Sequence, residues 1–340
     1  MPDRDPATAS TATASTTTVG AATVAPGGAT GIRRPPPSTM DVRELVAAKA
    51  ATGATVSVVI PARDEADRVG GVVTAIRTAL QVQVGLVDEL LVVDADSTDD
   101  TGGVARRAGA RVVRQSEVLP ALGTGPGKGE AMWKGLAASQ GSLVAFVDAD
   151  LTAFDPQLVA RLVEPLLLDP DPVLVKAAYD RPLTLEGHHD PTGGGRVTEL
   201  LARPVLAALW PALAWLAQPL GGEYAARREV LEALPFVRGY GVELGLLVDI
   251  HDAHGAGRIV EVDVGRREHE HQRLDALGRM ASEILQVALR RADRKGILEL
   301  AVEPGCQLPQ PRRSERGILG RRVAEISSDE RPPLTSVRRG

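Results

Sequence analysis

Short apolar runs alternate with amphipathic stretches along the first half of the chain. Four of these runs are rich in β-branched residues, and each ends at a polar residue or a proline: residues 56–60, 90–93, 110–113 and 143–147. Such runs are typical of parallel strands that are covered on both faces. Helical patterns lie between them, for example at residues 69–76 and 130–138. The alternation predicts an α/β fold with a mainly parallel, Rossmann-like sheet flanked by helices.

The second half of the chain is less regular, and helical patterns dominate it. A helix is predicted at residues 196–209, with a kink or break at Pro204, and the alternation at residues 259–264 predicts a strand. A later helix carries an apolar stripe that suits the core or a subunit interface better than a functional surface: Leu277, Met280, Ile284, Val287 and Ala288.

The most apolar window, residues 205–220, bears on membrane insertion. It is shorter than the ~20 residues that a spanning helix needs, and Pro211 and Pro219 interrupt it. We therefore expect a buried helix or a subunit interface there and no stable membrane insertion. The N-terminal residues lack the apolar segment of a secretory signal, which favours a cytoplasmic protein.

Both ends of the chain differ in composition from the middle. Residues 1–40 are rich in Thr, Ala, Ser, Gly and Pro, and residues 304–340 contain scattered Pro and Arg. Segments of this kind bury too little apolar surface to offset their ordering entropy. We therefore expect two disordered tails around a folded region of residues 41–303.

Charge and cysteine content exclude several classes of protein. The formal net charge of -5 argues against general nucleic-acid binding, which usually needs a basic surface. Cys306 is the single cysteine of the sequence, so an internal disulfide and a cysteine-based zinc site are excluded. A single thiol fits a reducing compartment.

Asp148-Ala149-Asp150 follows directly on the fourth apolar run. Two carboxylates this close repel each other unless a divalent cation lies between them and a ligand. Such a cation neutralises a diphosphate and stabilises a leaving nucleotide. The alternative is a solvated turn in which an aspartate caps the next helix. Ligands of parallel α/β sheets bind at the carboxyl ends of strands, and this position favours the metal site.

The loops after the first two apolar runs are candidates for nucleoside binding. The first loop offers backbone groups for a base and a carboxylate for ribose hydroxyls, from Pro61, Ala62, Arg63 and Glu65. The second loop offers Asp94 for a base or ribose contact. The alternative for both loops is that their acidic and hydroxyl residues favour the N-termini of the helices that follow.

The glycine-rich loop at residues 123–129 presents Lys128. It is not a P-loop of the kind that binds nucleoside triphosphates, because Leu122 stands where that motif needs a glycine and Gly129 stands where it needs Ser or Thr. A flexible loop that presents a lysine to an anionic ligand remains a good interpretation.

A second glycine run precedes the helix predicted at residue 196. Gly195, Arg196 and Thr198 together supply free backbone N–H groups, a guanidinium and a hydroxyl, which suit a phosphate or a carboxylate. The alternative is an ordinary loop and first helical turn.

His269 and His271 project to one side of an extended segment. A pair of this kind is usually a surface feature. Because the acidic pair at residues 148 and 150 needs a further ligand, one of these histidines is a candidate for the metal site. The histidines at residues 188–189 and 251–254 compete for this role, but they lie in stretches without other site features.

These motifs, in this order, resemble the glucosyl-3-phosphoglycerate synthases of actinobacteria, which are retaining glycosyltransferases with the GT-A fold. The resemblance covers roughly residues 41–289, and mannosyl-3-phosphoglycerate synthases share much of it. It rests on VVIPARDEADRV, ELLVVDADSTDDT, PGKGEAMWKGLA, FVDADL, VKAAYDRPL, GGGRVTELLARPVLAAL, QPLGGEYAARRE and GYGVELGLLVD.

The resemblance implies transfer of glucose from UDP-glucose to the 2-hydroxyl of 3-phospho-D-glycerate, with anomeric retention and release of UDP. It implies Mg²⁺ as the metal, with Mn²⁺ or Co²⁺ as substitutes, and a homodimer. Residues 41–180 would bind the nucleotide sugar. Residues 181–303 would form a helical region for acceptor binding and dimerisation.

The resemblance also assigns roles to matching residues. The nucleotide-sugar site would comprise Pro61, Ala62, Arg63, Glu65, Asp94, Ala95, Lys128, Asp148 and Ala149. The metal would be held by Asp150 and His269. The acceptor site would comprise Gly195, Arg196, Thr198 and His271. Glu243 would lie near the sugar and the acceptor and act in catalysis together with Asp150.

Two positions depart from the family pattern. Ala95 replaces a serine in a loop that contacts uracil or ribose, and His271 replaces an asparagine near the acceptor. The first change would loosen the choice of nucleotide, and the second would alter acceptor contacts.

Three alternatives to glucosyl transfer remain open from the sequence. The first is mannosyl transfer from GDP-mannose to the same acceptor, and the second is transfer to polyprenyl phosphate. The third is a nucleotide-sugar sensor without catalytic activity, against which the presence of Asp148, Asp150, Lys128 and Arg196 speaks.

Overall fold

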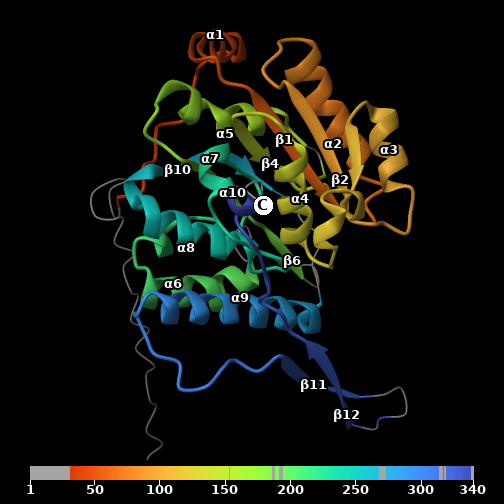
Figure 1. Cartoon of the computed structure of the whole chain (residues 1–340), viewed down its shortest axis with the longest axis vertical. Helices are drawn as coiled ribbons and strands as arrows, with labels where there is room; N and C mark the ends of the chain where they lie inside the picture. The colour runs from red at the N-terminus through yellow and green to blue at the C-terminus, as the bar shows by residue number, and fades with distance from the viewer. Residues whose placement is uncertain are drawn as a thin grey trace, which may run out of the picture.

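The computed structural model of the chain describes residues 31–152, 154–185, 188–190, 194–267, 273–313, 317 and 319–337. Its centre is a seven-stranded sheet in the order β10-β5-β8-β4-β1-β2-β3, with helices on both faces (Figure 1). The α/β fold with a mainly parallel sheet is therefore confirmed.

The first half of the chain forms the parallel part of this sheet. Its strands are β1 (Val56–Ala62), β2 (Glu89–Asp94), β3 (Arg111–Arg114) and β4 (Leu143–Phe146). The connecting helices are α2 (Val69–Ile76), α3 (Thr101–Ala108) and α4 (Lys128–Ala138). All four predicted strands are confirmed. The β-branched side chains of β1, β2 and β4 are buried because helices cover both faces of the sheet, whereas Val112 and Val113 of the edge strand β3 are only partly buried.

The second half of the chain completes the same sheet. Strand β8 (Tyr224–Arg227) lies between β4 and β5 (Leu174–Asp180) and is antiparallel to both. Strand β10 (Ile259–Arg266) pairs in parallel with β5, which confirms the predicted strand at residues 259–264. The sheet therefore crosses the expected boundary at residue 180, and residues on both sides of it build one core.

Two apolar layers pack on the two faces of the sheet. One layer includes α1 (Val42–Thr52), α2, α3 and α5 (Gln157–Leu168). The other includes α4, α6 (Arg203–Leu209), α8 (Val242–His254) and α9 (Leu274–Arg294). The stripe predicted on the late helix faces this second layer, where Ile284, Val287 and Ala288 are buried.

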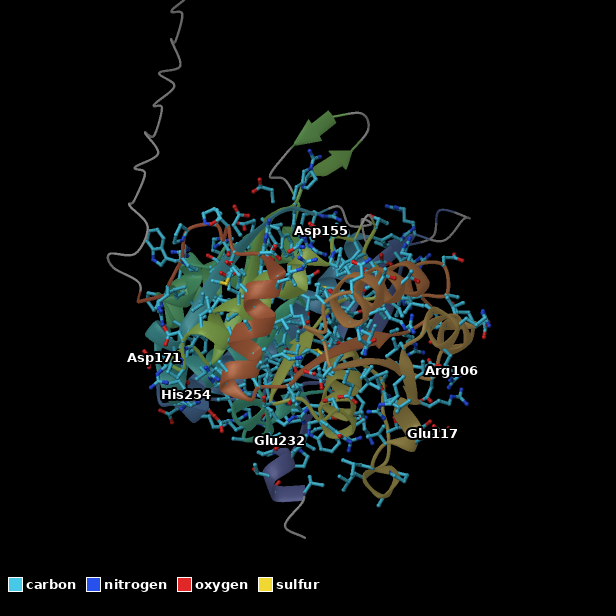
Figure 2. The ribbon with its side chains drawn as sticks, turned by 90° about the horizontal axis from the view of Figure 1, so that it is seen from above. Arg106, Glu117, Asp155, Asp171, Glu232 and His254 are labelled. Carbon is cyan, nitrogen blue, oxygen red and sulfur yellow. The ribbon has the colours of Figure 1, made fainter. Side chains whose placement is uncertain are left out.

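Short elements complete the described chain. They are β6 (Leu183–Leu185), β7 (His188–Asp190), β9 (Phe236–Val237), α7 (Arg228–Glu232), η1 (Arg77–Val82), η2 (Gln115–Glu117), η3 (Pro120–Leu122), η4 (Thr198–Ala202), η5 (Leu213–Trp215) and η6 (Ala256–Arg258). Charged residues such as Arg106 and Asp171 lie at the rim of the molecule when it is viewed from above (Figure 2).

The predicted break at Pro204 does not occur. Residues 198–209 form the π-helical turn η4 followed directly by α6, and Pro204 lies in the first turn of α6. The helix continues through Pro204, and the π-helical segment before this residue is the irregularity that accommodates a proline without a backbone N–H. Leu206, Trp210 and Leu213 are buried, as expected for the apolar window. Within the described ranges, no helix is long and apolar enough to cross a membrane.

The described parts of both tails differ from the prediction of disorder. Ile32 is buried, and Arg33 pairs with the edge of β10. Near the C-terminus, β11 (Gln307–Arg313) and β12 (Leu319–Glu325) form a hairpin. Strand β13 (Glu330–Arg331) then pairs with β9, and α10 (Leu334–Val337) follows. Composition does not predict these elements, because the residues with which the two segments pair, in β10 and β9, lie far away in the sequence.

Candidate active site

A cleft of ≈ 520 Å³ opens at the carboxyl ends of β1, β2 and β4. This is the edge at which parallel α/β sheets bind ligands. Most predicted site residues of the described chain line it: Pro61, Ala62, Arg63, Glu65, Ala95, Lys128, Asp148, Ala149, Asp150, Gly195, Arg196, Thr198 and Glu243. Residues predicted from six separate motifs therefore meet in one cavity.

The loops after β1 and β2 are tied to each other. Asp64 has a positive φ of 56°, and its Oδ1 accepts hydrogen bonds from the Thr98 backbone N (2.7 Å) and Oγ1 (3.0 Å). These hydrogen bonds lower the pKa of Asp64. The Glu65 backbone N donates to Thr101 Oγ1 at 2.8 Å. The tie fixes the wall of the cleft that carries Pro61, Ala62, Arg63, Glu65 and Ala95.

Asp94 is the one described candidate that does not line the cleft. It is buried at the end of β2, and its Oδ1 accepts a hydrogen bond from the Ser97 backbone N at 2.9 Å. Asp94 therefore stabilises the turn that follows β2, a role that the sequence did not predict, while its contact with a base or ribose stays a prediction.

Lys128 joins two acidic residues at the centre of the cleft. It is the first residue of α4, and its Nζ lies 2.6 Å from Asp148 Oδ1 and 2.9 Å from Glu243 Oε1. Burial alone would lower the pKa of Lys128, but the two carboxylates outweigh it and raise this pKa well above its usual value. The lysine is therefore a fixed positive charge that holds β4, α4 and α8 together at the site.

Asp150 lies beside this ion-paired group. Burial and the neighbouring charge of Asp148 raise the pKa of Asp150. A raised carboxyl pKa marks a site where a bound cation would be favourable, and carboxylate oxygens are the ligands that Mg²⁺ and Mn²⁺ prefer. Asp148 and Asp150 therefore fit a divalent metal.

A complete metal cage is not visible in the described residues, among which no three His, Cys, Asp or Glu side chains cluster in a way that would hold an ion. The predicted metal ligand His269 and the predicted acceptor residue His271 lie outside the described residues. His254, one of the competing histidines, lies at the surface (Figure 2) and does not line the cleft.

Arginines form a wall of the cleft that sequence reasoning missed. Arg181 follows β5, Arg267 follows β10, and Arg279 lies on α9, and all three line the cavity. The Arg267 guanidinium lies 5.6 Å from the centre of the Tyr179 ring and pairs with Glu223 at 3.4 Å. Such a wall suits phosphate and carboxylate groups. Single arginines carry no recognisable spacing, so only the fold brings them together.

The second glycine run lies against this wall. The Gly194 backbone N donates to the Arg181 carbonyl at 2.8 Å, and Gly195 has a φ of 72°, a conformation that favours glycine. Thr198 is buried at the start of η4. The predicted anion-binding residues therefore line the cleft beside Arg181, which follows β5.

Lys176 and Glu223 form a buried polar layer beneath the cleft. Lys176 Nζ donates to the Gly221 carbonyl at 2.5 Å and lies 5.0 Å from the centre of the Tyr224 ring. Burial lowers the pKa of Lys176 to about 8. Burial and the charge of Asp148 raise the pKa of Glu223, which accepts a hydrogen bond from the Tyr179 hydroxyl at 2.8 Å. The loop that precedes β8 is held by this layer, because it contains both the Gly221 carbonyl and Glu223.

Known proteins share both the sequence and this architecture. A family model described as Glycosyl transferase family 2 matches residues 57–200. The glucosyl-3-phosphoglycerate synthase of Mycolicibacterium paratuberculosis is 47% identical over 300 residues, which cover 87% of this chain and 88% of that protein. The chain belongs to the glucosyl-3-phosphoglycerate synthase family. The family expected from the sequence motifs is therefore confirmed.

Solved structures of this family have the same fold. Glucosyl-3-phosphoglycerate synthase from Mycobacterium tuberculosis, in complex with Mn²⁺, UDP and glucosyl-3-phosphoglycerate, is 42% identical with a TM-score of 0.79, covering 90% of this chain and 100% of that chain. Another structure of that synthase holds Mg²⁺ and UDP. Mannosyl-3-phosphoglycerate synthase from Rubrobacter xylanophilus is 38% identical with a TM-score of 0.83, covering 90% of this chain and 97% of that chain. The predicted GT-A fold is confirmed by these similarities.

Proposed function

We propose that this chain transfers glucose from UDP-glucose to the 2-hydroxyl of 3-phospho-D-glycerate, with retention at the anomeric carbon and release of UDP. The observation that carries the proposal is the ion-paired group of Lys128, Asp148 and Glu243 in a cleft with an arginine wall. The acidic side suits a metal-bound diphosphate, and the guanidinium side suits an acceptor with a phosphate and a carboxylate. Relatives named for this activity support the same reaction.

The donor would lie along the carboxyl ends of β1, β2 and β4. The nucleoside would contact the loop of Pro61, Ala62, Arg63 and Glu65 together with Asp94 and Ala95. Lys128, Asp148 and Ala149 would contact the diphosphate and the sugar. Asp150 and His269 would hold Mg²⁺, or Mn²⁺ or Co²⁺ in its place. The metal would neutralise the charge of the departing UDP.

The acceptor would lie on the opposite side of the cleft. Gly195, Arg196 and Thr198 would hold its phosphate or carboxylate, and His271 would complete this part of the site. The adjacent Arg181 supports this placement, because it lines the cleft together with Gly194 and Gly195.

Glu243 would position the sugar and the acceptor hydroxyl. It is buried and bonded to Lys128, so the lysine fixes its orientation. No lining residue is a convincing covalent nucleophile, which favours a front-face reaction in which the departing phosphate accepts the acceptor proton. Glu243→Gln keeps the size of the side chain and removes its charge. It is expected to lower kcat, and full kcat with unchanged binding would contradict the role.

Mannosyl transfer from GDP-mannose is the second candidate function. The similarity of the fold to that of the Rubrobacter mannosyl synthase, with a TM-score of 0.83, supports this candidate. The same fold can bind either donor, so the residues of the binding site determine the choice between UDP-glucose and GDP-mannose.

Nucleotide release tests the donor and the acceptor together. The purified protein is given Mg²⁺ and either UDP-glucose or GDP-mannose, each with and without 3-phosphoglycerate. We expect UDP release that depends on 3-phosphoglycerate, and release of GDP at least about ten-fold slower. Preference for GDP-mannose would replace the first function by the second. Folded protein that releases neither nucleotide would reject the phosphoglycerate assignment.

We also propose a cytoplasmic homodimer. Leu200 on η4 and Leu274 on α9 are exposed apolar side chains on two elements that pack together. Exposed apolar side chains on neighbouring elements suit a subunit interface. The single, unpaired Cys306 fits a reducing compartment.

A further inference from the structure

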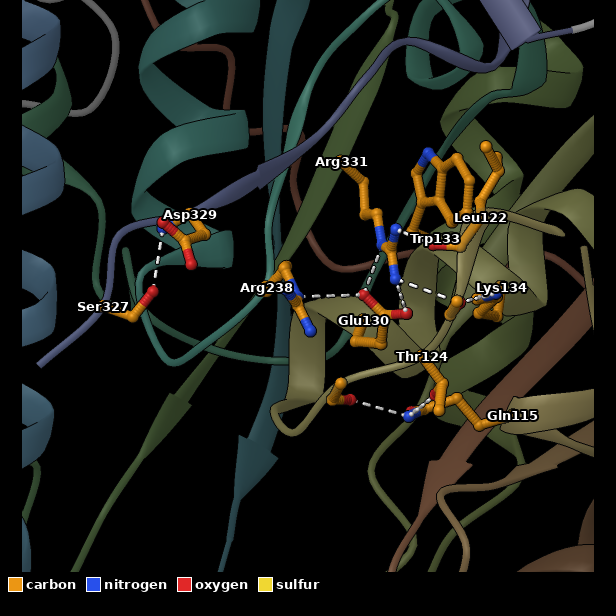
Figure 3. A network of polar contacts seen from close by, with 12 residues as sticks. Gln115, Leu122, Thr124, Glu130, Trp133, Lys134, Arg238, Ser327, Asp329 and Arg331 are labelled. Atoms are coloured by element: carbon orange, nitrogen blue, oxygen red, sulfur yellow. Dashed lines mark hydrogen bonds and ion pairs between the residues drawn. The ribbon is translucent and has the colours of Figure 1, made fainter. Parts of the chain in front are cut away.

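The segment 327–334, here called the C-terminal strap, runs across the molecule to the start of α4. Its Arg331 lies against Glu130, two residues after Lys128 on that helix (Figure 3). Arg331 Nε and Nη2 donate to the two carboxylate oxygens of Glu130, each at 2.6 Å. Glu130 is fully buried, so this two-point contact compensates a charge that water does not reach.

The same guanidinium also holds the glycine-rich loop that precedes α4. Arg331 Nη1 donates to the Leu122 carbonyl at 2.7 Å, and Nη2 donates to the Gly123 carbonyl at 3.2 Å. Lys134 Nζ donates to the Gly123 carbonyl at 2.8 Å from the other side. One side chain of the strap therefore bonds both the loop before Lys128 and the helical turn that contains it.

The strap is anchored on both sides of Arg331. Its Glu330 and Arg331 pair with β9, and Glu330 also forms an ion pair with Arg291. The Trp133 indole N–H donates to the Pro332 carbonyl at 2.9 Å, and the Arg331 guanidinium lies 5.4 Å from the centre of the Trp133 ring. Beyond it, Leu334 is buried in the core. The strap is thus a fixed part of the fold, and Arg331 has little freedom to move.

A second arginine ties the strap to the same carboxylate. Arg238 Nε lies 3.3 Å from Glu130 Oε2, and the Arg238 backbone N donates to the Asp329 carbonyl. The Glu130 backbone N in turn donates to the Arg238 carbonyl at 3.0 Å. Three segments that are far apart in sequence therefore converge on the first turn of α4.

We propose that Arg331 is a positioning residue for the donor site: through Glu130 and the glycine-rich loop it sets the place of Lys128. The inference rests on the proposed function, because Lys128, Gly127 and Pro126 line the cleft that the donor would occupy. Arg331 itself does not line that cleft, so it acts on the donor only through the loop and the helix.

The test is the binding of UDP in the presence of Mn²⁺, measured by calorimetry without acceptor. Arg331→Met removes every polar contact of the guanidinium while keeping an unbranched apolar side chain. Arg322→Met is the matched control, because Arg322 is exposed on β12 of the same C-terminal region. We expect Arg331→Met to raise the Kd for UDP about ten-fold or more, since the buried Glu130 loses its two-point contact and keeps only the longer ion pair with Arg238. The control should stay within about two-fold of the wild type.

Two further measurements separate positioning from a general loss of structure. Arg331→Lys keeps the charge but not the two-point contact, so it should restore part of the UDP affinity. The KM for 3-phosphoglycerate should change less than about two-fold in each variant, because the acceptor residues lie on the other wall. A lowered melting temperature with an unchanged Kd for UDP, or equal losses for donor and acceptor, would overturn the positioning role. Wild-type protein that binds no UDP would instead reject the proposed function.

Discussion

Lys176 shows how a single buried charge is tolerated beneath the cleft. Its side chain is almost fully buried, yet its ammonium has the Gly221 carbonyl and the face of the Tyr224 ring as partners. Burial lowers the pKa of Lys176 to about 8, although Glu243 and Glu223 act in the opposite direction. The desolvation of the ammonium therefore outweighs the attraction of the two carboxylates.

The stability contributed by Lys176 is expected to rise with pH. Its pKa is about 8 in the folded state and near its ordinary value of 10.5 in the unfolded state, so the unfolded chain binds more protons between these values. The cost of burying the charged form is present below pH 8 and disappears as the pH rises. Between pH 7.5 and 9.5 the free energy of unfolding should shift in favour of the wild type, relative to Lys176→Met, by about 2 kcal/mol.

Denaturant unfolding of the two proteins at each pH measures this shift. The titration of the other groups cancels in the difference between the two proteins, and the lost hydrogen bond to Gly221 adds only a constant. A difference that stays the same from pH 7.5 to 9.5 would show that Lys176 remains fully charged in the folded protein.

At the scale of elements, the loop before β8 packs directly against the ion-paired group. A Cβ on Gly222 would lie 2.2 Å from Lys128 Nζ and 2.5 Å from Asp148 Oδ1. Only glycine therefore allows this loop to pack against the two side chains while they remain paired. Because β8 is antiparallel between β4 and β5, the loop arrives at the same edge of the sheet as Asp148.

Gly222→Ala should force Lys128 and Asp148 apart and lower kcat/KM about ten-fold or more, because small displacements of positioning groups are costly. Steady-state kinetics with UDP-glucose and 3-phosphoglycerate measure the effect. Gly71→Ala is the matched control, since a Cβ there meets no atom within 4 Å and the residue lies in α2. Equal activity of the two variants would mean that the pairing of Lys128 with Asp148 is not needed for transfer.

At the scale of the whole molecule, one continuous sheet carries both walls of the cleft. Residues from β1 to β4 bring the acidic side, and the ends of β5 and β10 bring Arg181 and Arg267. The helices α6 and α9 lie side by side on the far side of the second apolar layer (Figure 1). Leu200 on η4, which directly precedes α6, and Leu274 at the start of α9 are the exposed side chains of the proposed subunit interface.

Leu200→Glu is expected to convert the dimer into a monomer, because a carboxylate in an apolar interface would have to be desolvated without a partner. Light scattering coupled to size-exclusion chromatography measures the mass. Val82→Glu is the control, since Val82 is also an exposed apolar residue but lies on η1 beside α2. A wild-type protein with the mass of one chain at micromolar concentration would contradict the proposed dimer.

Local sequence patterns are sufficient to predict the four parallel strands of the first half and the acidic part of the site. Both follow from local pattern: β-branched runs form buried strands, and polar residues directly after them lie at one edge of the sheet. Asp148, Asp150 and the loop of residues 61–65 could therefore be placed before any coordinates were known. Lys128 and Arg196 were found because glycines flank them, which is also a local signal.

Contacts between residues that are far apart in the sequence follow from the fold and not from local pattern. The arginine wall, the Lys176 layer and the strap with Arg331 consist of single charged residues, and no spacing in the sequence marks them. The C-terminal segment has the composition of a disordered tail, yet its described residues form regular contacts because Glu130 and β9, both far away in the sequence, supply their partners. A buried charged side chain is stable only when a second group compensates its charge, and the fold determines which group lies close enough to do so.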